Sequence, residues 1–134
     1  MLQITTHVHR QMVGIAYDGY PLEACGLLAG DPISGRAEVF YPCRNTAESS
    51  RVYNVDPKDY LRADRDAEAR GLELIGVMHS HTHTEAYPSP TDVAQAPDPG
   101  WHYVIVSLRD ESPRVRSYRI VGEQVTEEPV TLLR

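Results

Sequence analysis

The chain has 134 residues, a length that suits one domain with one hydrophobic core. Hydrophobic residues make up 41% and charged residues 24%, which is ordinary for a soluble globular protein. The net charge of −6 disfavours nucleic acid as a partner, because phosphates require a basic protein face. No apolar run approaches the roughly 20 residues that cross a membrane, and residues 1–12 do not resemble a signal peptide. We therefore expect a cytoplasmic protein with no membrane partner.

The first quarter of the chain predicts a helix followed by two strands. Thr5 or Thr6 can cap a helix whose apolar residues recur at helical spacing, and Gly19 lies where the helix should end. The apolar segment 23–30 and the partly alternating segment 36–45 predict two strands joined by a turn.

The middle of the chain predicts a second helix between strands. Segment 51–55 indicates a short third strand. Asp56 is a good N-cap, Pro57 suits the first helical position, and Gly71 suits the C-terminal end. The apolar run 72–81 that follows predicts a buried strand.

The last part predicts a short helix and a further group of strands. The helix covers residues 90–96. The expected strands cover residues 101–108, 114–121 and 125–133. Pro129 favours an edge position for the last of them. Six or seven strands with two main helices indicate an α/β (α+β) fold, in which helices flank a mixed sheet within a single domain 1–134.

The segment from residue 79 to residue 92 reads HSHTHTEAYPSPTD and has the ligands of a metal site. Residues i and i+2 of a strand point to one face, so His79 and His81 can share one ion. Asp92 enters from the first turn of the short helix. Two imidazoles and a carboxylate suit zinc, and three protein ligands leave a fourth position for water, as in catalytic sites.

Catalysis also needs a proton acceptor and a group that stabilises an oxyanion. Ser89 is a candidate for the second role, although Ser-Pro followed by an acid is also an ordinary helix cap. Glu23, an acid at the start of an apolar strand, is the best candidate for the first role, but other acids are not excluded. Cys25 and Cys43 are most simply reduced, small core residues.

These residues resemble the JAMM (MPN+/Mov34) zinc metalloproteases, whose pattern is an early Glu followed by H-[ST]-H-x7-S-x2-D. The resemblance spans about residues 2–120 and includes the contexts PLEACGLLAG and AYPSPTD. The matching positions are Glu23, His79, Ser80, His81, Ser89 and Asp92.

The resemblance implies a JAMM/cytidine-deaminase-like domain that binds one Zn²⁺ per chain through His79, His81 and Asp92. It implies that Glu23 holds the attacking water and shuttles its proton, and that Ser89 donates to the oxyanion. The implied reaction is hydrolysis of a peptide or isopeptide bond after the C-terminal Gly-Gly of a ubiquitin-like protein. The chain resembles the short bacterial subgroup that removes cysteine from a sulfur-carrier protein during cysteine biosynthesis.

The sequence departs from many family members at one position, where His83 replaces a proline or a small residue. We expect His83 to be a loop residue that faces solvent. Two other functions stay open: a zinc hydrolase of small peptides or amides without a protein carrier, and a non-catalytic interaction domain stabilised by zinc. A homodimer also stays open.

Overall fold

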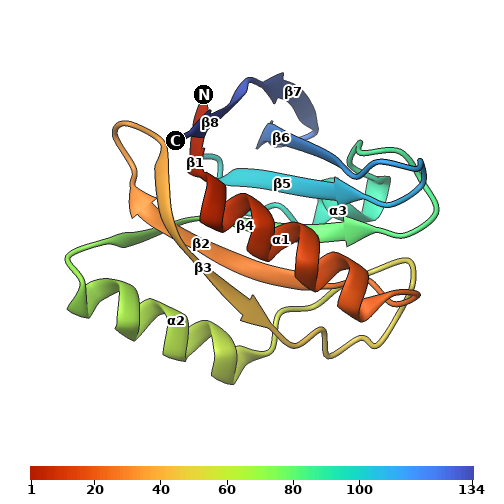
Figure 1. Cartoon of the computed structure of the whole chain (residues 1–134), viewed down its shortest axis with the longest axis horizontal. Coiled ribbons are helices and arrows are strands. Elements are labelled where there is room, and N and C mark those ends of the chain that lie inside the picture. The colour runs from red at the N-terminus through yellow and green to blue at the C-terminus, as the bar shows by residue number, and fades with distance from the viewer.

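The computed structural model describes all 134 residues as one mixed sheet of eight strands with three helices (Figure 1). This confirms the expected fold class. The elements are β1 (Leu2–Thr5), α1 (Thr6–Gly19), β2 (Cys25–Asp31), β3 (Arg36–Cys43), α2 (Pro57–Ala69), β4 (Glu73–His81), α3 (Pro90–Ala94), β5 (His102–Ser107), β6 (Arg114–Val121), β7 (Gln124–Glu128) and β8 (Val130–Leu133). The strand order is β7-β6-β5-β4-β2-β3-β1-β8. None of the helices is long and apolar enough to cross a membrane.

The two long helices cover opposite faces of the sheet. Thr5 caps α1, since its hydroxyl accepts a hydrogen bond from the amide of Val8. The buried stripe of α1 packs on one face, which includes Leu28, whereas Ala63 of α2 packs on the other face with Leu27. Adjacent residues of β2 therefore contribute to different halves of the core.

Strand β4 lies at the centre of the sheet, between β5 and β2. Met78 joins the cluster under α1, and Val77 joins the cluster under α2. By alternation, His79 and His81 point to the α2 face. A register shift between β2 and β4 leaves Ile75 unpaired, so Leu74 also packs on the α2 face. The side chains of Leu74, Val77, His79 and His81 thus follow one another along this face.

The C-terminal segment differs from expectation. We expected one strand over residues 125–133, but Pro129 divides it into β7 and β8, which lie at opposite edges of the sheet. Because one residue joins these two edges, the sheet must curve round until they meet, as Figure 1 shows. Strand β1, which the sequence did not predict, lies between β3 and β8, and the amide of Leu2 donates to the carbonyl of Pro129.

The predicted strand at residues 51–55 was wrong. The structure has only an isolated bridge between Asn45 and Val55. The Asn45 side chain organises this loop instead, because its Nδ2 donates to the carbonyls of Glu23 and Val52 and its Oδ1 accepts from the amides of Ala47 and Asn54. Local side-chain bonds of this kind compete with a strand ladder.

Candidate metal centre

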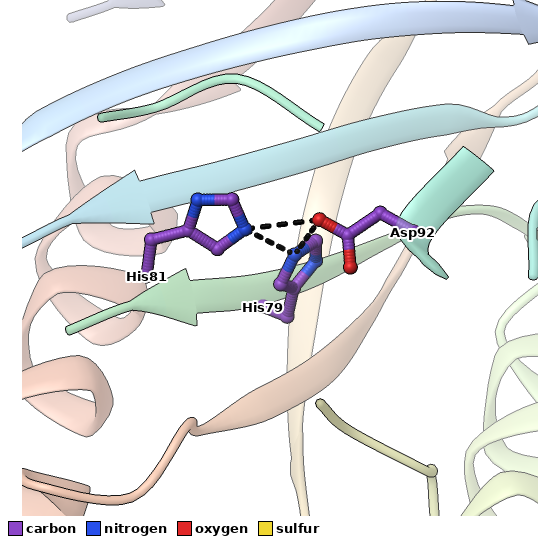
Figure 2. A group of neighbouring side chains, drawn as sticks. All are labelled: His79, His81 and Asp92. Carbon is purple, nitrogen blue, oxygen red and sulfur yellow. Dashed lines mark hydrogen bonds and ion pairs between the residues drawn. The ribbon is translucent and has the colours of Figure 1, made fainter. Parts of the chain in front are cut away.

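His79, His81 and Asp92 form a compact, buried triangle (Figure 2). The two histidines come from the end of β4, and Asp92 comes from the first turn of α3. The Nε2 atoms of the histidines lie 3.1 Å apart, and the Asp92 Oδ2 atom lies 3.1 Å from His79 Nε2 and 2.9 Å from His81 Nε2. A tetrahedral zinc ion with bonds of about 2.0 Å has ligand atoms about 3.3 Å apart, so the triangle has nearly the size of one face of that tetrahedron.

Neighbouring groups fix the orientation of both imidazoles. His81 Nδ1 donates to the carbonyl of Glu85 at 2.8 Å, so a neutral His81 carries its proton on Nδ1 and presents the lone pair of Nε2 to the triangle. The ring of His79 stacks on Tyr53 with centroids 4.3 Å apart. Burial lowers the pKa of His79, which keeps it neutral, as a metal ligand must be.

Asp92 is held as an ionised carboxylate. Burial alone would raise the pKa of Asp92, but the nearby imidazoles of His79 and His81, whose Nε2 atoms lie within 3.1 Å of Asp92 Oδ2, outweigh burial and lower it. The amide of Ser89 also donates to Asp92 Oδ2 at 2.9 Å. Two imidazole nitrogens and one carboxylate oxygen directed at one point fit a divalent cation by size and ligand type.

Glu23 lies two residues before β2, whose first residue, Cys25, pairs with His79 of β4. Its backbone is fixed because its amide donates to the carbonyl of Ser49 and its carbonyl accepts from Asn45. The side chain is 5% exposed, and its Oε1 has no hydrogen-bond partner. Burial raises the pKa of the Glu23 carboxyl group to about 7, with His81 lowering and Asp92 raising it by their charges. A carboxyl group with this pKa can both accept and return a proton near neutral pH.

Ser80 connects the Glu23 segment to the histidines. Its hydroxyl accepts from the amide of Ala24 at 2.8 Å, and its own amide donates to the carbonyl of Ala24 at 2.9 Å. Ser80 is fully buried, and it points away from the His79 and His81 face. It therefore fixes the position of Glu23 relative to the triangle without entering the triangle itself.

Ser89 is the N-cap of α3. Its hydroxyl oxygen accepts from the amide of Asp92 at 3.1 Å, and Asp92 returns the bond to the amide of Ser89, which completes a capping box. The hydroxyl hydrogen of Ser89 makes no bond within the chain. The two functions that the sequence left as alternatives, helix cap and oxyanion donor, are therefore compatible, because one uses a lone pair and the other uses the hydrogen.

A groove opens beside the triangle on the α2 face. It has a volume of about 790 Å³, and its floor includes Leu27, Val77 and Tyr103. Tyr53 lines the groove and also stacks on His79, so the groove lies next to the triangle. Sequence reasoning missed Tyr53 and the groove, because nothing in the loop 45–56 marks an aromatic ring that will pack on a histidine.

The remaining predicted residues take simpler positions. His83 is exposed, as expected, and its Nε2 lies 3.3 Å from the hydroxyl of Tyr20. Cys25 and Cys43 are buried and unbridged, which agrees with the expectation of reduced core residues. Trp101 is partly buried and packs against the core cluster on the α2 face, where it stacks on Tyr60 with centroids 6.3 Å apart.

The chain belongs to the family described as prokaryotic homologs of the JAB domain, whose model matches residues 5–121. This confirms the resemblance to the JAMM (MPN+/Mov34) proteins. The chain is similar to a protein of Mycobacterium tuberculosis named CysO-cysteine peptidase, with 43% identity over 134 residues, covering 99% of this chain and 92% of the relative.

Two further comparisons agree with this family. A protein named desampylase from Haloferax volcanii is 32% identical over 108 residues, covering 80% of this chain and 76% of that protein. The solution structure of a protein from Desulfitobacterium hafniense matches with a TM-score of 0.90 and 34% identity, covering 99% of this chain and 93% of the other. The chain is therefore a hydrolase of peptide or isopeptide bonds.

Proposed function

We propose that this protein is a zinc peptidase that cleaves after the C-terminal Gly-Gly of a ubiquitin-like or sulfur-carrier protein. The observation that carries the proposal is the triangle of His79, His81 and Asp92, with the buried, unpartnered carboxyl group of Glu23 beside it. We propose one Zn²⁺ per chain, because the structure offers one group of ligands of this kind.

The residues divide the chemistry between them. Zinc, when bound, would polarise the scissile carbonyl and make a water more acidic. Glu23 accepts the proton of the attacking water and delivers it to the leaving amine, because its buried carboxyl oxygen has no hydrogen-bond partner within the chain. The free hydroxyl hydrogen of Ser89 donates to the oxygen that becomes negative as the tetrahedral intermediate forms.

The groove beside Tyr53 is the binding site that we propose for the carrier tail. The backbone of loop 82–88, between the second and third ligands, is another candidate partner for the tail. In the structure, however, the carbonyls of residues 84, 85 and 86 already accept from Ser107, His81 and Tyr118, respectively. The groove has a largely hydrophobic lining and adjoins the triangle at Tyr53, so an extended tail can lie there with its end at the triangle.

The names of the relatives support the choice of substrate. One is named CysO-cysteine peptidase and another desampylase. For this chain we propose release of cysteine from a carrier–cysteine adduct. A cytoplasmic location and the dimeric state stay predictions, and the unbridged Cys25 and Cys43 are consistent with the former.

The test uses a sulfur-carrier protein extended by one cysteine after Gly-Gly. We expect the zinc-loaded protein to release free cysteine, and we expect a Gly→Val change before the cysteine to block release, because a Cβ atom does not fit close backbone contacts. Glu23→Gln should keep zinc and lose roughly 10²-fold or more in rate. Glu123→Gln, at an exposed turn, is the matched control.

Each competing function gives a different result in these assays. A small-amide hydrolase would cleave the glycine and valine forms equally. A non-catalytic zinc domain would bind zinc and release no cysteine from either form.

A further inference from the structure

A second hollow lies next to the groove beside Tyr53, at the other end of β4. This second hollow has a volume of about 590 Å³ and includes Leu74 and Ile75. It shares Tyr60, Asp98 and Trp101 with the first groove, so the two adjoin, and we refer to them together as the channel. The stacked rings of Tyr60 and Trp101 line both parts and mark where the two adjoin.

The second hollow is strongly acidic. Its charged lining residues are Asp64, Glu68, Glu73 and Asp98, and it has no basic lining residue. None of the four carboxylates forms an ion pair, although the neighbouring acids Asp59 and Asp66 of α2 are paired with arginines. The acids belong to three separate segments, α2, the start of β4 and the loop before β5.

A metal ion is the wrong occupant for this hollow. The only group of three His, Cys, Asp or Glu side chains that comes close enough to share one ion is the His79 triangle. Carboxylates that lie apart from one another around two aromatic rings instead suit the side chain of arginine or lysine. Its cationic group can stack on a ring and pair with more than one carboxylate.

The distance along the channel shows which part of a tail would reach the acids. Leu74 of the second hollow and His79 of the triangle lie five residues apart on β4. At about 3.3 Å per residue this is roughly 17 Å, and an extended tail lying along the channel covers it with about five residues of its own. The globular part of a carrier would begin just beyond that point.

We propose that the acidic end of this channel selects carriers with an arginine or lysine about five residues before the scissile bond. The cationic side chain stacks on Trp101 and Tyr60 and pairs with the carboxylates of Asp64, Glu68 and Glu73. This selection rests on the proposed function, because the same tail carries its Gly-Gly to the His79 triangle. It makes recognition of the carrier depend on charge at one tail position.

The experiment uses synthetic ten-residue peptides that end in Gly-Gly-Cys and differ only at the fifth residue before the scissile bond. We expect the arginine peptide to exceed the alanine peptide about tenfold in kcat/KM through KM, and the glutamate peptide to be poorer still. The advantage of arginine should shrink as salt increases, because these carboxylates are exposed.

Protein variants then locate the effect. In Asp64→Asn/Glu68→Gln/Glu73→Gln, the ratio between the arginine and alanine peptides should fall close to one, whereas Glu123→Gln, far along the chain at an exposed turn, should keep it. Asp98 stays unchanged, because its carboxylate also accepts from the amide of Gly100. The changed side chains are exposed and isosteric, so the variant should fold.

A second readout does not depend on catalysis. Trp101 is the only tryptophan of the chain, so its fluorescence reports directly on occupancy of the channel. Arginine peptides should perturb Trp101 at lower concentration than alanine peptides. Equal cleavage and equal titration of both peptides would overturn the selection while leaving the peptidase intact. Absence of cleavage of every Gly-Gly-Cys peptide would instead contradict the proposed function, and the titration would still decide the selection.

Discussion

The most informative single change is Ser89→Ala, because the structure gives the Ser89 hydroxyl two separate tasks. The change removes the lone pair that accepts from the amide of Asp92 at 3.1 Å. Loss of such an N-cap costs about 1 kcal/mol of stability. For a chain of this size, that lowers the melting temperature by about 4 °C. Differential scanning calorimetry measures this part of the effect.

The same change removes the free hydroxyl hydrogen that we assign to the oxyanion. Loss of one such donor typically costs roughly 10²-fold in kcat. Both effects should therefore appear together in Ser89→Ala, with cysteine release from a carrier–cysteine adduct as the rate assay. Zinc content should be measured beside the rate, because the amide of Ser89 also holds Asp92.

Ser89→Gly separates the two tasks. Glycine is an acceptable N-cap and costs only about a few tenths of a kcal/mol relative to serine, but it has no hydroxyl. It should melt close to the parent protein and still lose roughly 10²-fold in kcat. Full activity in Ser89→Gly with normal zinc content would refute the oxyanion role and leave Ser89 as a cap alone.

The metal site could be predicted from the sequence because its geometry is local. Alternation in a strand places His79 and His81 on one face. Ser89 at the N-cap and Pro90 at the first helical position predict the start of the short helix that carries Asp92. The N-caps of α1 and α2 could be predicted for the same reason, because a capping side chain accepts a hydrogen bond from an amide no more than three residues away.

The features that sequence reasoning missed depend on contacts between distant residues. Strand β1 has only four residues, and what stabilises it is pairing with β8 at the opposite end of the chain. The prediction of a strand at 51–55 was wrong because the Asn45 side chain hydrogen-bonds the carbonyl of Val52 and the amide of Asn54, which a strand would use for pairing. Tyr53, Tyr60 and Trp101 line one channel only because α2 folds back over β4, and no local pattern reports that contact.

Three further changes test the fold and the site. Removing zinc with a chelator should lower the melting temperature and abolish activity, and re-addition should restore both. Gly30→Ala should strongly destabilise the protein, because its Cβ would lie 1.8 Å from a backbone oxygen, whereas Gly14→Ala, with open space in α1, should be neutral or stabilising. Glu128 is buried, which alone would raise its pKa, but bonds from His102 and Ser117 lower the pKa to about 2 from 4.5. A depressed carboxyl pKa contributes stability above its unfolded value that disappears as pH falls toward the folded value. Glu128→Gln should therefore cost about 3 kcal/mol at pH 7, and the difference from the parent protein in urea unfolding should vanish between about pH 4.5 and pH 2; a difference that persists at pH 2 would mean that Glu128 acts through packing instead of charge.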